Sequence, residues 1–193
     1  MKKIAMIVSL VPAFATCEVN AQLFIDEEAL QDVESITLLP IVLPADVEFD
    51  NEQKGIKKAQ RELSQNFALK GYVLDSPRNW ILPDEWTYES MKDMSPEEIA
   101  KLAPQSADHF ALGFIDSIAS SSKVVTSKAT VSVSARIINR ETGKVVWENA
   151  ESRETKENFI SMGLFIMALT DDEMTAMYSA FVELFKALPE KEY

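Results

Sequence analysis

An alternation of apolar and polar side chains over residues 124–138 is the clearest pattern in the chain. A period of two is typical of a β-strand with one buried and one solvent-exposed face. The apolar set is Val131, Val133, Ala135 and Ile137, and the polar set is Thr130, Ser132, Ser134 and Arg136. A turn at 139–143 and a returning strand at 144–150 complete a predicted β-hairpin.

The amino-terminal half has the pattern of a β-α-β unit. Residues 35–43 form an apolar run with β-branched side chains, which predicts a buried strand. Pro40 inside this run indicates an edge position, a bulge or the end of the strand. The next apolar residues recur at helical spacing, namely Ile56, Ala59, Leu63 and Phe67. Gly71 then predicts the end of the helix, before a short strand at 72–74, and the unit fits a right-handed parallel crossover.

The remaining segments predict further helices and strands. Ser95 and Glu98 have the spacing of a capping box, which predicts the start of a short helix. Residues 108–118 are predicted as a strand, and the serine-rich residues 119–123 as a flexible loop or hairpin tip. A second capping box opens a final helix at Thr170. The apolar stripe of this helix is Met174, Met177, Tyr178, Phe181, Leu184, Phe185 and Leu188.

Together these elements predict an α/β fold. We expect a mixed β-sheet with a β-α-β start, a β-meander and packed helices, in a single globular domain at residues 35–190. Residues 22–34 are expected to be a tether, within which 27–33 could form a short helix. The chain has 193 residues, 47% of them hydrophobic, which is enough for one domain with a sizeable core.

The first residues have the layout of a bacterial export signal. Two lysines precede an apolar stretch at 4–14 that is too short to span a bilayer, and Cys17 follows as the only cysteine. Two processing routes are open: a signal at 1–16 with lipid on Cys17, or a signal peptide at 1–21 removed by an ordinary signal peptidase. Small residues before Cys17 favour lipidation, whereas Thr16 departs from the Gly, Ala or Ser usual at that position. An intramolecular disulfide is excluded.

The chain is acidic, with 19 basic and 31 acidic residues. Removal of the two lysines of the export signal leaves 17 basic residues and a formal charge of −14. Nucleic-acid phosphates and anionic lipid headgroups repel such a chain. We therefore expect no nucleic-acid partner, and we expect any membrane attachment to come from covalent lipid or from a partner protein.

The sequence contains no pattern that predicts catalysis. The single histidine, His109, stands beside Asp108, but adjacent residues of a strand point to opposite faces, so the carboxylate is badly placed to orient the ring as a general base. A His-rich metal site would need further histidines, and the five glycines form no phosphate-binding loop. We therefore expect no catalytic residue, no metal and no cofactor.

Two apolar segments are candidate contact surfaces. Residues 80–94 carry Trp, Tyr and Met, which are enriched at interfaces, and residues 159–169 are apolar almost all round. The interface candidates within them are Trp80, Trp86, Tyr88, Phe159, Phe165 and Met167. Each segment has an alternative interpretation: a satellite hydrophobic cluster under a long loop for the first, and a buried part of the core for the second.

Several short strings carry a resemblance to a known family. They are ITLLPIVLP at 36–44, a helix ending in KGY at 70–72, ADHFALGFIDSI at 107–118, TVSVSARIIN at 130–139 and TGKVVWE at 142–148. In their order and content they resemble the envelope lipoproteins typified by a meningococcal surface-antigen candidate. That group is similar in architecture to the amino-terminal domain of TolB, to the curli-secretion lipoprotein and to lipoproteins that activate penicillin-binding proteins.

The resemblance implies a lipid on Cys17 and transfers no catalytic motif. We expect a non-catalytic protein of the periplasm, anchored to the outer membrane, that acts as an assembly factor or as a subunit of an envelope or secretion complex. Its partner would be an envelope protein or further copies of itself in a ring. The alternative is a periplasmic module that binds a small ligand such as a glycan fragment, with Trp80 and Trp86 stacking on it.

Overall fold

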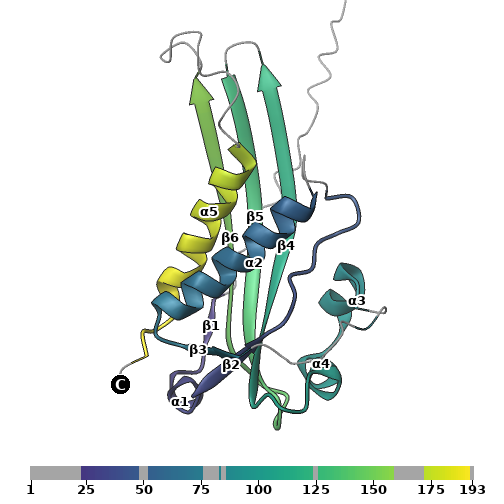
Figure 1. Cartoon of the computed structure of the whole chain (residues 1–193), viewed down its shortest axis with the longest axis vertical. Helices are drawn as coiled ribbons and strands as arrows, with labels where there is room; N and C mark the ends of the chain where they lie inside the picture. Colours follow the sequence, from purple (N-terminus) through teal and green to yellow (C-terminus); the bar gives the residue numbers. More distant parts are fainter. Residues whose placement is uncertain are drawn as a thin grey trace, which may run out of the picture.

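A computed structural model describes residues 23–47, 52–75, 83, 86–123, 126–158 and 172–191. Within these residues a six-stranded mixed sheet has the order β1-β6-β5-β4-β2-β3 (Figure 1). The strands are β1 (Phe24–Ile25), β2 (Ser35–Leu38), β3 (Val73–Asp75), β4 (His109–Lys123), β5 (Thr126–Asn139) and β6 (Val145–Asn158). The helices are α1 (Glu27–Gln31), α2 (Glu52–Leu69), α3 (Tyr88–Asp93), α4 (Pro96–Leu102) and α5 (Asp172–Leu184), with a 3-10 turn at Phe185–Ala187. The predicted α/β class is confirmed.

The β-α-β start is confirmed, with β2 lying parallel to both β3 and β4. Gly71 adopts a φ of 86°, the left-handed conformation that ends α2 at low cost. The first strand is shorter than predicted, because Pro40 interrupts the run. The Gln60 side chain of α2 then satisfies the backbone that leaves the sheet, accepting from Ile41 N at 2.8 Å and donating to Leu39 O at 3.3 Å.

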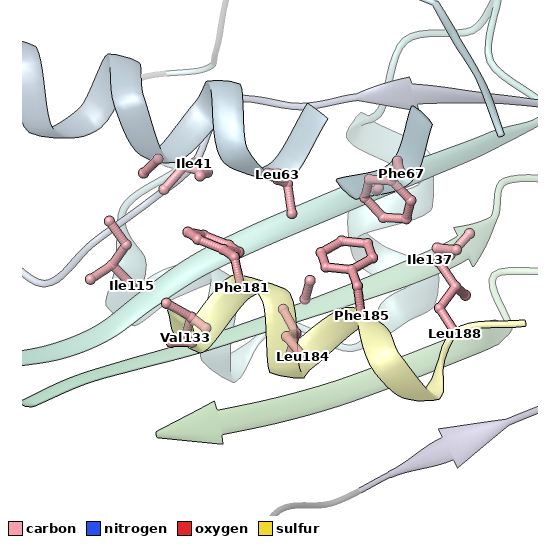
Figure 2. Packing of buried hydrophobic residues seen from close by; sticks show 14 of the residues in the cluster. Ile41, Leu63, Phe67, Ile115, Val133, Ile137, Phe181, Leu184, Phe185 and Leu188 are labelled. Carbon is pink, nitrogen blue, oxygen red and sulfur yellow. The ribbon is translucent and has the colours of Figure 1, made fainter. Parts of the chain in front are cut away.

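The first core lies between the sheet and the pair of helices α2 and α5, which cover one face together (Figure 1). Phe67 of α2 is fully buried, and its ring meets that of Phe185 edge to face at 4.6 Å. Figure 2 shows Phe181 and Phe185 pointing toward α2 over the inward side chains of the strands. Most of the predicted stripe of the last helix is buried here, but Tyr178 is 52% exposed, because it lies on the outer side of α5.

A second core covers the opposite face of the sheet, which corrects the expectation that this face is solvent-exposed. Ser132, Ser134 and Arg136 of β5 are at most 9% exposed. They are covered because the neighbouring strand β4 presents Phe110 and Phe114 on the same face, where α3, α4 and Trp86 pack. The lower part of the sheet is therefore buried on both faces.

The antiparallel strands β4 and β6 are longer than predicted, and together with β5 they extend beyond the helices as an arm (Figure 1). Residues 119–123 form no loop, since the ladder between β4 and β5 continues to the pair of Lys123 with Thr126. A register shift between Ile115 and Ser117 marks a β-bulge in β4. β6 likewise runs past the predicted end at residue 150, pairing with β5 as far as Asn158.

The segment before β2 is also packed onto the sheet. β1 pairs with β6 through Trp147 and Glu148, and the expected short helix is present as α1. Leu30 and Val33 enter the first core. At the other end of the chain, Lys191 Nζ donates to the carbonyl of Leu30 at 3.4 Å and to that of Gln31. A cation is favourable at this position because the carboxyl end of α1 carries partial negative charge.

Candidate functional site

The predicted site residues fall into two groups. Five of them lie outside the described residues: Cys17, Trp80, Phe159, Phe165 and Met167. Trp86 and Tyr88 are described, and both lie on the face of the sheet that carries the second core. Residues 86–94, which hold them, are therefore a part of the predicted contact surface that the structure describes.

Trp86 is buried, with 3% of its surface exposed. It packs in the second core with Met91, Ile99 and Phe114, and its backbone N donates to Pro83 O at 2.9 Å. An indole ring enclosed in this way is poorly placed to stack on a sugar ring. Its position fits the satellite-cluster interpretation of the sequence.

Tyr88 begins α3 and links this helix to the sheet. Thr87 caps the helix and forms a reciprocal capping box with Ser90, which the sequence analysis missed because Ser replaces the usual Glu or Gln. The Tyr88 hydroxyl donates to Asp116 Oδ1 at 2.9 Å. Burial, together with the negative charge of Asp116, raises the pKa of the Tyr88 hydroxyl far above its ordinary range. Tyr88 therefore remains a neutral donor.

Lys92 completes the contact between α3 and the sheet. Its Nζ lies 2.6 Å from Asp116 Oδ1 and donates to Ser134 Oγ at 3.0 Å. The same ammonium group sits 4.3 Å from the centroid of the Phe114 ring, within the range of a cation–π contact. Arg136 adds a hydrogen bond from its guanidinium to Met91 O at 3.0 Å. These charge-assisted contacts fix residues 87–92 as a rigid part of the surface.

His109 has a structural partner. Its Nε2 lies 3.0 Å from Asn139 Nδ2, and Asn139 Oδ1 accepts from Thr142 N at 2.9 Å. The amide orientation set by Thr142 makes Nδ2 the donor, so His109 Nε2 must be the unprotonated acceptor. The ring is 6% exposed, and burial lowers its pKa. The lone pair on His109 Nε2 therefore accepts a hydrogen bond within the fold and is not presented to a substrate.

Several hollows of moderate size lie among the described residues. One, of about 420 Å³, is lined by Asp32, Asp108, His109 and Arg140 among others, and another, of about 500 Å³, by Leu30, Tyr72 and Lys191 among others. Within the described part of the chain no cluster of His, Cys, Asp and Glu has the arrangement to hold a metal ion. No helix in that part is both long enough and apolar enough to cross a membrane.

Large apolar side chains are exposed at both edge strands. Leu23 and Phe24 of the β1 edge are 51% and 45% exposed. Leu69, the last residue of α2, is 81% exposed, and Val73, the first of β3, is 51% exposed. Neither pair was predicted from the sequence. They are candidate contact positions beside open sheet edges.

The chain matches no protein-family model. No curated protein matches it either. Among solved structures, it is similar to the PelC dodecamer from Paraburkholderia phytofirmans, with a TM-score of 0.50, 14% identity, and coverage of 83% of this chain and 89% of that one.

Lipoprotein GNA1162 from Neisseria meningitidis is also similar, with a TM-score of 0.43, 17% identity, and coverage of 77% of this chain and 95% of that one. A minor lipoprotein from Acinetobacter baumannii gives a TM-score of 0.43 and 7% identity, with coverage of 83% and 98%. Lipoproteins are therefore among the solved structures similar to this chain, at low sequence identity.

Proposed function

We propose that this chain is a non-catalytic protein of the bacterial cell envelope, and that it acts by assembling with copies of itself or with an envelope partner. The main support for this proposal is the structural similarity to the PelC dodecamer, a similarity that covers 83% of the present chain. The exposed apolar residues beside β1 and β3 offer further support, because such residues at open edges favour contacts between chains.

The location forms part of the same proposal. Residues 1–16 would direct export, lipid on Cys17 would hold the protein at the outer membrane, and the domain formed by residues 35–190 together with β1 and α1 would lie in the periplasm. Lipid would supply position and the domain would supply specificity. Intact mass of the mature protein tests this: a chain that begins at Cys17 with a diacylglyceryl adduct is expected. A chain that begins at Gln22 without lipid would contradict the anchoring.

A non-catalytic role is supported by the surroundings of His109. The Asn139 amide occupies the Nε2 lone pair that a general base would need, and burial opposes protonation of the ring. The proposed work of the domain is therefore recognition rather than chemistry, as an assembly factor or as a subunit of an envelope or secretion complex.

The segment 159–169, which follows β6 in the chain, is the proposed contact for self-assembly. Phe165→Asp and Met167→Asp should each abolish the assembly while leaving the domain folded, as measured by native mass and circular dichroism. Leu102→Asp on α4 is a matched control, since Leu102 is also an exposed apolar residue, at 39%. Unfolding by both of the first two variants would instead identify the segment as core.

A further inference from the structure

The arm formed by β4, β5 and β6 has two long outer edges. β2 reaches β4 only through Phe110 and Ala111, apart from an isolated bridge to Phe114. β1 reaches β6 only through Trp147 and Glu148. Among the described residues, no strand pairs with β4 beyond that bridge or with β6 beyond Glu148, on the sides that face away from β5.

The hydrogen bonds at the base of the arm show which backbone groups point outward. Ile115 N donates to Val42 O at 3.1 Å. Before the bulge, therefore, the backbone N–H and C=O groups of odd-numbered β4 residues point away from β5. The bulge between Ile115 and Ser117 reverses this alternation. Beyond it, the backbone N–H and C=O groups of even-numbered residues such as Ser120 point away from β5. On β6, Val146 O accepts from Asp26 N at 2.9 Å, so even-numbered residues such as Ser152 point outward.

The β4 edge lacks the usual protection against strand pairing. Residues 117–122, with the sequence SIASSS, contain no charge and no proline, although natural edges are commonly blocked by one or the other. The described side chains at 117 and at 119–121 are exposed, and Ile118 is partly buried. Small uncharged side chains of this kind leave the outward N–H and C=O groups accessible to a second strand.

Several of the described charges near the two edges are paired within the chain. On β6, Glu151 lies 3.6 Å from Arg153, and Glu154 lies 2.6 Å from Lys128 of β5. At the base of the β4 edge, Asp116 is paired with Lys92. An acidic chain repels its own copies, so a contact between copies is most favourable where the carboxylates are already neutralised.

We propose that the outer edge of β4 in one copy pairs with the outer edge of β6 in a second copy. Both strands run antiparallel to β5 and hence parallel to each other, so copies related by rotation would pair in parallel. The β4 edge at 117–123 and the β6 edge at 149–158 are of comparable length, and seven residues span about 23 Å. The contact joins two different surfaces, so repeating it by a rotation that divides the full circle into equal parts closes a ring.

This inference rests on the proposed function, since both require self-assembly, and it adds an edge-to-edge contact to the one proposed at residues 159–169. Ser120→Pro tests it first, because proline removes an outward N–H and leaves the bonds to β5 intact. The variant should fold, as judged by circular dichroism. The affinity of each contact between copies should fall at least about tenfold, because one hydrogen bond is lost and the proline ring hinders the approach of the second strand. Ser120→Thr keeps the N–H and should assemble like the wild type.

A cysteine pair provides a second test that does not depend on proline. Ser121 and Ser152 both lie on the face of the second core, since Ser121 pairs with Lys128, and Ser152 pairs with and hydrogen-bonds Ser132. Within one copy they are separated by two strand spacings, about 9.5 Å, and by a stagger of four residues along the strands, about 13 Å, which is beyond the reach of a disulfide. Ser121→Cys combined with Ser152→Cys should therefore give a ladder of cross-linked copies on oxidation, whereas either single variant should stop at a dimer.

The possible outcomes distinguish this inference from the proposed function on which it rests. A monomeric wild type at the concentrations tested would overturn both. A wild-type oligomer that keeps its mass in Ser120→Pro, and whose double-cysteine variant gives no ladder, would overturn the edge pairing alone. A ladder from the double variant together with loss of assembly in Ser120→Pro is the expected result.

Discussion

Replacing Asp116 by Asn should loosen α3 from the sheet. The Asp116 carboxylate accepts from the Lys92 ammonium at 2.6 Å and from the Tyr88 hydroxyl at 2.9 Å, and its side chain is 16% exposed. Both contacts fall on Oδ1, so the Asn carbonyl oxygen can still accept them, but the negative charge is lost. Lys92 would then face the Phe114 ring and Ser134 Oγ without a counterion.

The magnitude follows from this geometry. A hydrogen bond to a charged group contributes about 1.5–3 kcal/mol. The Lys92 side chain is 35% exposed, so water compensates part of the loss, and we expect the free energy of unfolding to fall by about 1.5–2 kcal/mol. For a chain of this length, that corresponds to a decrease of about 3–8 °C in Tm.

Urea and thermal unfolding would measure the change, and absorbance titration of tyrosine provides an independent readout. Because the charge of Asp116 helps to raise the pKa of Tyr88, that pKa should fall in Asp116→Asn. Asp93→Asn on the same helix is the control, since Asp93 is exposed, and its effect should stay within about 0.5 kcal/mol. Equal stability of the two variants would refute the reasoning and leave apolar packing as the attachment of α3.

Three other perturbations test the fold. Burial lowers the pKa of His109, so as the pH falls the unfolded chain binds a proton before the folded chain does. The free energy of unfolding should therefore decrease as the pH drops from about 6.5 through the folded-state pKa. Unfolding experiments at several pH values should show a weaker pH dependence for His109→Gln. Gly143→Ala should cost about 2 kcal/mol or more by urea unfolding, because φ is +67° and the new Cβ would lie 2.9 Å from Glu97 Cα. Phe67→Ala should cost about 3–5 kcal/mol in the same assay, because the ring is fully buried against Phe185.

Local signals predicted much of the fold. The helical spacing before Gly71 predicted α2, and the capping box of Ser95 and Glu98 is present, with reciprocal bonds at 3.3 and 2.9 Å. The alternation in β5 correctly identified the side chains that face α2 and α5. Each of these features is decided by residues close together in the sequence, which is why the pattern alone was sufficient.

The features that were missed depend on distant residues. Ser134 and Arg136 have the polar character of a solvent-exposed face, yet they are buried because Lys92 and Met91 of α3 supply their partners. The serine run at 119–123 lacks an apolar period and forms a strand only because β5 pairs with it. For the candidate site, the sequence located a cluster of aromatic residues but could not decide between a contact surface and a buried cluster, whereas the structure encloses Trp86.

The most direct test is the native mass of the protein extracted with mild detergent from its own envelope. The mass of the assembly and the mass of the released chain are obtained in one experiment. We expect an assembly of several copies, each chain beginning at Cys17 and carrying a diacylglyceryl group. A single unlipidated chain that begins at Gln22 would contradict both the anchoring and the self-assembly.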